Sequence, residues 1–210
     1  MLFKNREQAA ELLVKKLNTY QRRSNVIVFA IPRGAVGMGK SIAQALFGAF
    51  DIIVVKKIGA PNNPELAIGA VGPENTVYWD LALCKVLRVD KRIMNYALRI
   101  KKKERRDREK VLRGNKPYPS IKDKTVIIVD DGVATGATSI VAAKFLKKQG
   151  VGKSILATPV IAKDTLKKVT DYYNEVVYLE SSRDFHAVGQ FYDKFPQVSD
   201  EEVVAILRNV

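Results

Sequence analysis

The feature that most constrains this chain is a series of short, uninterrupted apolar runs rich in valine and isoleucine. The main runs lie at residues 26–31, 52–56, 125–129, 154–159 and 175–179. Helical patterns of apolar residues separate them, at 6–19, 36–46, 90–113, 138–149 and 164–170. Apolar runs without polar alternation are typical of strands covered on both faces. Such strands in alternation with helices predict an α/β fold, with a central, mostly parallel sheet flanked by helices.

The length of 210 residues fits a single domain with a small appendage. We expect a core at about residues 22–180. Beyond residue 180 the alternation stops and aromatic residues gather, before a short closing helix at 200–207. The predicted helix at 6–19 and the segment 181–210 are therefore expected to form a small hood over the core.

Composition excludes several classes of protein. No apolar stretch approaches the ~18 residues that cross a membrane, and the first seven residues lack the apolar segment of a secretory signal. The chain has one cysteine, Cys84, so it can build neither a disulfide framework nor a cysteine zinc site. We therefore expect a cytoplasmic protein that does not bind membranes.

The net charge of +14 is concentrated in one segment. Residues 85–116 hold fourteen Lys and Arg residues and four acids, so the rest of the chain is nearly balanced. Within this segment, residues 90–113 predict one long basic helix. Its second half is expected to project into water because every residue of 101–110 is charged. It is either a solvated face or an arm that binds a polyanion.

The start of this basic helix also carries local signals. Asp90 is suited to cap the first turn, because a side-chain oxygen at this position accepts a hydrogen bond from the backbone. Ile93, Ala97 and Ile100 repeat at helical spacing and predict an apolar stripe that packs on the protein.

Two strand ends carry phosphate-type motifs, and ligands bind at the carboxyl ends of strands in parallel sheets. The first motif follows the run at 26–31, where Gly34, Gly39, Lys40 and Ser41 match the spacing G-x-x-x-x-G-K-[ST]. This is the phosphate loop of nucleotide hydrolases. Taken literally, it predicts an ATPase or kinase, with an acid at the end of the run at 125–129 as a partner.

The second motif begins with two adjacent acids, Asp130 and Asp131, directly after the run at 125–129. Two carboxylates that leave a buried strand together cost free energy unless a diol or a cation satisfies them. Small residues and hydroxyls follow at 135–138, at the start of a predicted helix. Backbone N–H groups at a helix start bind anions. Two acids that can bind vicinal hydroxyls, next to N–H groups that can bind an anion, fit a ribose 5-phosphate. Helix capping alone would explain one aspartate but not the pair.

Residues 130–139, with two acids, a short linker and then Thr-Gly-Ala-Thr, closely resemble the phosphoribosyl-pyrophosphate (PRPP) loop of type I phosphoribosyltransferases. The whole chain looks most similar to small, uncharacterised members that carry Pro-Glu-Leu-Ala-Ile-Gly-Ala-Val at 64–71. On this resemblance the match to a nucleotide-hydrolase loop is a coincidence. The implied activity is transfer of ribose 5-phosphate from PRPP to a nitrogenous base or amine, with release of pyrophosphate.

The resemblance also implies roles for named residues. Asp130 and Asp131 would act in catalysis by holding the ribose hydroxyls and Mg²⁺, the latter through those hydroxyls or water. Arg33 would meet the pyrophosphate, in a loop expected to contain a strained or cis peptide near Arg33–Gly34. The other expected PRPP contacts are Gly34, Lys56, Lys57, Gly132, Val133, Ala134, Thr135, Gly136, Ala137, Thr138 and Ser139. Only one of Lys56 and Lys57 is expected to face the site, since successive strand residues point in opposite directions.

The family's pattern leaves three questions open. Members that act on 6-oxopurines carry an acid where this chain has Ala134, which counts against such bases. The Gly- and Pro-containing segment 59–72 is either a mobile lid or a β-hairpin or packed loop. Phe185, Phe191 and Tyr192 either stack on a base or close the core.

The sequence also leaves the binding partners of the chain open. A homo-oligomer is expected. The basic helix at 90–113 suggests weak nucleic-acid binding, and the alternative function is a regulator that senses PRPP and binds nucleic acid.

Overall fold

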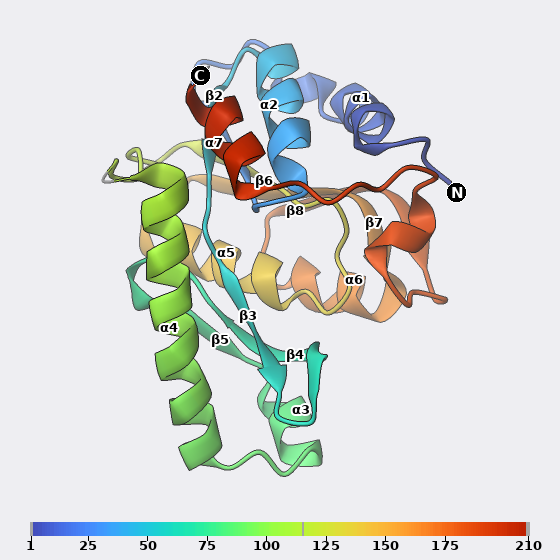
Figure 1. Cartoon of the computed structure of the whole chain (residues 1–210). Helices are drawn as coiled ribbons and strands as arrows, with labels where there is room; N and C mark the ends of the chain where they lie inside the picture. Colours follow the sequence, from blue (N-terminus) through green and yellow to red (C-terminus); the bar gives the residue numbers. More distant parts are fainter. Residues whose placement is uncertain (1, 115, 209–210) are drawn as a thin grey trace.

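The computed structural model describes residues 2–114 and 116–208. Its main sheet has five parallel strands in the order β2-β1-β6-β7-β8 (Figure 1). The strands are β1 Val26–Ala30, β2 Ala49–Ile52, β6 Thr125–Val129, β7 Lys153–Ala162 and β8 Glu175–Ser182. The predicted α/β fold with a central parallel sheet is confirmed.

Helices cover both faces of the main sheet (Figure 1). One face carries α1 Arg6–Lys16, α2 Ala35–Leu46 and α7 Asp200–Arg208. The other face carries α5 Ala137–Lys148 and α6 Lys163–Thr170. Alternate residues of β1 enter the two cores, with Val28 on the first face and Phe29 on the second. Every residue of β1 and β6 is therefore buried, which explains their lack of polar alternation.

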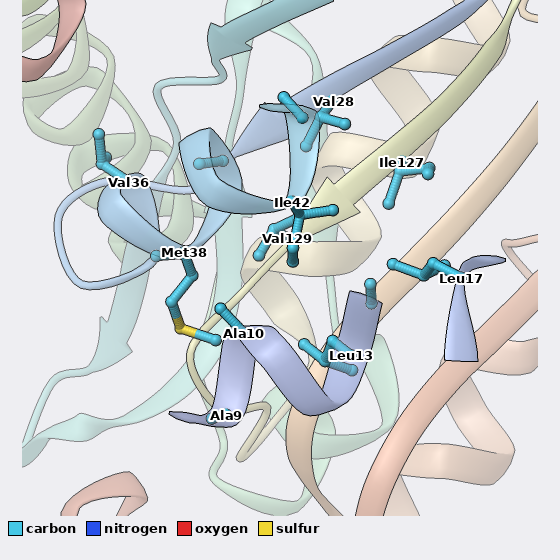
Figure 2. Close-up of a cluster of buried hydrophobic side chains, with 14 of the residues drawn as sticks. Ala9, Ala10, Leu13, Leu17, Val28, Val36, Met38, Ile42, Ile127 and Val129 are labelled. Atoms are coloured by element: carbon cyan, nitrogen blue, oxygen red, sulfur yellow. The ribbon is translucent and has the colours of Figure 1, made fainter. Parts of the chain in front are cut away.

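Figure 2 shows the core between α1, α2 and the main sheet. Small side chains on α1, Ala9 and Ala10, let this helix lie close to Met38 on α2. Leu13 is fully buried there, and removal of such a side chain costs about 2–5 kcal/mol. Helix α1 is therefore anchored well enough to hold its first residue, Arg6, in a fixed place.

A second, antiparallel sheet has the strand order β3-β4-β5. Its strands are β3 Lys56–Ala60, β4 Asn63–Val71 and β5 Val77–Trp79. Residues of α3 Leu81–Val86 and α4 Lys91–Arg113 pack with one side of this sheet, and α5 packs with the other. Short 3-10 turns lie at η1 Asn18–Tyr20, η2 Pro73–Asn75 and η3 Val188–Phe191.

Where the chain passes between the sheets, one sequence prediction fails and one open alternative is resolved. The predicted strand at 52–56 is wrong, because β2 ends at Ile52 and β3 begins at Lys56. Residues 53–55 are buried without being a strand, because Val54 packs in the first core while Ile53 and Val55 pack in the second. The segment 59–72 is not a free loop but mostly the second half of a β-hairpin, which was the alternative.

Helix α4 is capped by Asp90 as predicted, because its carboxylate accepts a hydrogen bond from the backbone N–H of Ile93 at 2.8 Å. The predicted apolar stripe is wrong for two of its three residues, whereas Ala97 packs against the small sheet as expected. Ile93 and Ile100 are exposed, whereas Met94 and Leu98 pack against the small sheet. The buried stripe consists of Met94, Ala97 and Leu98, because this face of the helix meets the small sheet.

The second half of α4 does not project freely into water, which corrects another prediction. Arg105 and Arg113 are buried. Arg105 pairs with Glu109 at 2.8 Å, and Arg113 pairs with Asp51 of β2. Arginine stems bury apolar surface while their charged ends find partners, so a charged run does not require a solvated helix.

Within the described residues, no helix combines the length and apolar character that a membrane span needs. The division of the chain into a core at about 22–180 and a hood stays a prediction.

Candidate active site

Two loops meet at the carboxyl-terminal edge of the main sheet, where β1 and β6 are neighbours. Gly34 follows β1, and Asp131 follows β6. A methyl group placed on Gly34 would lie 1.8 Å from Oδ2 of Asp131, so the backbone here lies directly against the carboxylate. The structure thus brings together the two segments that the sequence motifs singled out.

The loop after β1 is short and turns directly into α2. Its peptide bond between Pro32 and Arg33 is cis. The sequence placed such a bond near Arg33–Gly34, and the structure has it one peptide earlier. The Arg33 side chain is exposed, and its Nη1 lies 3.7 Å from Oδ1 of Asp200 at the start of α7.

The literal match to a nucleotide-hydrolase loop is not supported by this geometry. Helix α2 already begins at Ala35, so Lys40 and Ser41 lie inside the helix rather than at the end of a phosphate loop. Gly39 has a packing role instead, because a methyl group there would lie 2.7 Å from Cβ of Ala30. Among the residues of this motif, Gly39 therefore allows close contact between α2 and β1.

The two acids after β6 have different surroundings. Asp130 is buried, and its Oδ2 accepts a hydrogen bond from Oγ of Ser139 at 3.4 Å. Ser139 is fully buried, and its carbonyl accepts a hydrogen bond from the Tyr173 hydroxyl at 2.6 Å. Burial, followed by the charge of Asp131, raises the pKa of Asp130 well above its ordinary value. This carboxyl needs hydroxyl donors or a cation to stay ionised.

Arg6, the first residue of α1, pairs with the second acid. Its Nε donates to Oδ2 of Asp131 at 2.9 Å, and its Nη1 donates to the carbonyl of Pro196 at 2.7 Å. The guanidinium also lies 3.7 Å from the ring centre of Phe195. Burial raises the pKa of Asp131, and the Arg6 charge opposes that shift. Sequence analysis missed Arg6, because nothing in its neighbourhood separates it from a surface arginine.

Residues 132–136 lead from the acids to the start of α5. Gly136 has a φ of +75°, and a methyl group on it would lie 2.9 Å from side-chain carbons of Thr165 and Val169. Glycine is therefore required by both conformation and space. Gly136 is the N-cap of α5 and offers no side chain to bond its first N–H groups. Those groups and the helix dipole make an anion cradle, with the half-buried Thr135 and Thr138 beside it.

The linker itself is held against the sheet. Val133 is buried, and its N–H donates to the carbonyl of Val160 at 2.9 Å. The hydroxyl of Thr165 donates to the carbonyl of Ala134, whose side chain is exposed. Gly132 lies under the C-terminal segment, because a methyl group there would be 2.4 Å from Val188. The path of the loop is therefore fixed by backbone hydrogen bonds, by the close approach at Gly132 and by the buried side chain of Val133.

The aromatic C-terminal segment covers this loop. The Tyr192 hydroxyl donates to the carbonyl of Asp131 at 2.7 Å. Phe191 and Tyr192 are buried, so the core role expected as the alternative to base stacking is confirmed for these two. The backbone N–H of Phe3 donates to the carbonyl of Phe191 at 2.8 Å. The first described residues and the segment at 191–192 therefore lie together beside the predicted PRPP loop.

The two lysines of β3 point to different neighbours. The side chain of Lys57 is partly exposed and pairs with the exposed Glu65 of the same hairpin at 2.6 Å. Lys56 is half-buried and lies 3.7 Å from Glu104 of α4. Burial, followed by the charge of Arg108, lowers the pKa of Lys56. Lys56, rather than Lys57, thus belongs to the charges that face α4.

Comparison with known proteins decides the family. The sequence model of the phosphoribosyl transferase domain matches residues 2–196. The chain belongs to this family. It is 35% identical over 207 residues to "Putative phosphoribosyl transferase Rv0571c" of Mycobacterium tuberculosis, an alignment that covers 98% of the chain and 46% of the relative. The chain therefore spans about half the length of the curated relatives it matches.

Solved structures agree with this assignment. The TT1426 protein of Thermus thermophilus is 32% identical, with a TM-score of 0.82, and the match covers 100% of this chain and 99% of that one. A purine phosphoribosyltransferase of Pyrococcus horikoshii has a TM-score of 0.51 at 17% identity, with 92% of each chain covered. The second likeness concerns the fold alone.

The donor set of this phosphoribosyl transferase domain limits how it can hold a metal ion. Among the residues described, no group of three or more His, Cys, Asp or Glu side chains is arranged to bind a metal. Mg²⁺ is commonly held by one or two carboxylates together with substrate oxygens and water. The pair Asp130 and Asp131 suits that second arrangement, and it does not form a cage by itself.

Proposed function

We propose that this chain transfers the ribose 5-phosphate group of PRPP to a nitrogen nucleophile and releases pyrophosphate. The observation that carries the proposal is the contact between Gly34 and Asp131, beside the glycine-capped start of α5. This arrangement offers carboxylates for two hydroxyls, an N–H cradle for a phosphate and an arginine for a second anion. A ribose 5-phosphate with a pyrophosphate leaving group combines all three.

Each part of the site has a role in this reaction. Asp130 and Asp131 accept hydrogen bonds from the ribose hydroxyls, and the first turn of α5 binds the 5-phosphate through its backbone N–H groups. Arg33 balances the charge that grows on pyrophosphate as its bond to the anomeric carbon breaks. The nitrogen nucleophile then bonds to that carbon and loses a proton to the solvent. The domain contributes position and electrostatics, and the aromatic C-terminal segment keeps water out.

Mg²⁺ would enter with PRPP and stabilise the negative charge of the leaving group. Asp130 and Asp131 would hold it through the ribose hydroxyls or through water. The ionised form of both acids is costly in the folded protein, because burial raises their pKa values. Binding of a cation or hydroxyls at this pair relieves that cost, which couples ligand binding to stability.

The acceptor is a nitrogenous base or amine. Ala134 supplies no carboxylate at the position of the predicted PRPP loop where 6-oxopurine enzymes carry one. We therefore propose an acceptor other than hypoxanthine, guanine or xanthine.

Calorimetric titration with PRPP tests the proposal. PRPP with Mg²⁺ should bind the wild-type chain, and D131N should lose binding because the diol loses a charged acceptor. K40A is the matched control: it keeps PRPP binding here, and it would abolish ligand binding in a nucleotide hydrolase. Absence of PRPP binding to the wild-type chain, or its loss in K40A alone, would contradict the proposal.

A second candidate function is a PRPP-sensing regulator that binds nucleic acid. The exposed residues of α4 between positions 91 and 110 include six cations and one acid, Asp107. The cations are Lys91, Arg92, Arg99, Lys103, Arg106 and Lys110. Retention of RNA or DNA should then fall steeply with salt and respond to PRPP. Retention that is independent of salt and of PRPP would leave this face a solvated surface.

A homo-oligomer and a cytoplasmic location also stay proposals. Three exposed apolar residues of and next to α3, Leu81, Val86 and Leu87, favour association of copies. Sedimentation of the purified chain tests this, and a monomer at micromolar concentration would contradict it.

A further inference from the structure

Helix α4 delivers one arginine to the pyrophosphate side of the candidate site. Nη2 of Arg108 lies 2.5 Å from Oδ1 of Asp200, the first residue of α7. The same oxygen atom lies 3.7 Å from Nη1 of Arg33. Arg33 is adjacent in sequence to Gly34, which lies against Asp131. Arg33 in the loop after β1 and Arg108 in α4 are 75 residues apart in the sequence. Their guanidinium groups nevertheless approach the same carboxylate oxygen beside the candidate site.

A third cation belongs to this group. Lys56 is close enough to Arg108 for the arginine's charge to lower the lysine's pKa. Glu104 lies 3.7 Å from Lys56, but it also bonds Lys101 at 2.8 Å. Like charges held this close repel one another unless an anion lies between them. Asp200 is shared by Arg33 and Arg108, Glu104 is shared by Lys56 and Lys101, and the charge of Glu201 also faces Arg33, so four cations face three carboxylates.

The side chain of Arg108 is also incompletely satisfied. Its Nε is buried, and no hydrogen-bond acceptor for it is found among the described residues. An arginine presents its N–H groups in a fixed fork that matches the oxygens of a phosphate. Asp200 takes only one of them, so the guanidinium keeps donors for a larger anion.

Resting on the function proposed above, we infer that Arg108 is a pyrophosphate-binding residue and that Asp200 holds its place as an internal counterion. In this arrangement Arg33, Lys56 and Arg108 form one set of cations for the diphosphate of PRPP. Asp200 is partly exposed at the start of a helix, so its carboxylate can turn toward water when a diphosphate arrives. Figure 1 shows α7 beside the end of α4 that lies near the main sheet.

Titration with inorganic pyrophosphate and Mg²⁺ tests this inference without knowledge of the acceptor. R108Q should weaken pyrophosphate binding by roughly 10- to 100-fold, the usual range for loss of a charged hydrogen-bond donor. R108K keeps the charge without the fork and should recover part of that loss. The control is R106Q, on the opposite, exposed side of α4, which should bind pyrophosphate as the wild type does.

D200N separates a binding role from a structural one, because both R108Q and D200N break the same ion pair between α4 and α7. If Arg108 binds the anion, D200N should strengthen pyrophosphate binding by about two- to fivefold, the range for removal of a competing surface carboxylate. Equal weakening in R108Q and D200N would overturn the inference and leave Arg108 as a structural residue. Unchanged binding in R108Q would overturn it as well.

Two outcomes of these titrations distinguish a failure of this inference from a failure of the proposed function. If the wild-type chain binds PRPP while R108Q loses none of its affinity for pyrophosphate, the function stands and the role of Arg108 does not. If the wild-type chain binds neither PRPP nor pyrophosphate, the proposed function itself fails.

Discussion

The two sides of the candidate site are built in different ways. The side around the two acids consists of backbone and buried groups: Gly34 against Asp131, Gly136 at the start of α5, and Asp130 held by Ser139. The side toward α4 consists of long side chains such as Arg33 and Arg108, which meet across partly exposed ion pairs. A backbone site tolerates almost no added atom, whereas a side-chain site adapts. Substitutions should therefore have large effects on the first side and graded ones on the second.

The largest effect is expected for G34A. The added methyl group would lie 1.8 Å from Oδ2 of Asp131, so the carboxylate must leave its position. PRPP affinity should fall at least ~100-fold, since both the diol acceptor and the backbone approach are lost. The matched control is G37A in α2, where no atom lies within 4 Å of the added methyl group. It should raise stability by about 0.5–1 kcal/mol. Calorimetry measures the PRPP affinity, and thermal melting measures the stability. Equal PRPP affinity in G34A and G37A would contradict the view that this side of the site is built from closely packed backbone.

The next effect concerns stability and its dependence on pH, through D130N. Because burial raises the pKa of Asp130 in the folded protein, the folded state binds the proton more tightly than the unfolded state. Stability of the unliganded wild type should therefore fall as pH rises above the ordinary carboxyl pKa of about 4. D130N removes this loss, so it should be more stable than the wild type at pH 7 and differ little at pH 3. Thermal melting across pH measures it, and a D130N that is less stable at pH 7 would contradict this account.

A smaller effect is expected for R6A, because Arg6 joins α1 to the C-terminal segment at Pro196, and both belong to the predicted hood. The variant loses hydrogen bonds to Asp131 and Pro196 and leaves a buried carboxyl without its partner. Stability should fall by about 1–3 kcal/mol, and the segment near Pro196 should be cut faster by a protease. R92A, an exposed arginine on α4, is the control and should change neither. Unchanged proteolysis in R6A would show that the hood is held without Arg6.

The smallest effect is expected for K57A. Lys57 pairs only with the fully exposed Glu65 among the ion pairs of the described residues. Exposed pairs contribute little to stability, so the melting temperature and the affinity for PRPP should both stay at wild-type values. A clear loss of PRPP affinity would assign Lys57, and not Lys56, to the pyrophosphate side.

Much of the fold and of the candidate site could be predicted from the sequence, because the apolar runs and the motif after the run at 125–129 are both local signals. The runs at 26–31 and 125–129 are apolar without alternation, and the strands there are indeed buried on both faces. The acids and glycine of residues 130–136 lie in one continuous segment, so their motif is visible without tertiary structure.

The failed predictions depend on contacts between distant residues. The apolar run at 52–56 leaves the main sheet because the next residues join the hairpin, which no local pattern distinguishes. Arg6 and Arg108 reach the site through pairs separated by 125 and 92 residues in the sequence. Charge composition alone assigned the second half of α4 to solvent, because it does not reveal that Asp51, Asp200 and Glu109 supply partners.

The clasp between residues 3–6 and 191–196 has a consequence for the order in which the protein forms. Phe3 exchanges backbone hydrogen bonds with Phe191 and Asp193, and Arg6 bonds Pro196, so this contact closes a loop of nearly the whole described chain. Contacts of such long sequence separation form late and slowly. A ribosome that makes the chain from its N-terminus releases Arg6 long before Pro196. The predicted PRPP loop therefore stays uncovered during synthesis, and the clasp over it can close only after the last strand of the main sheet has emerged.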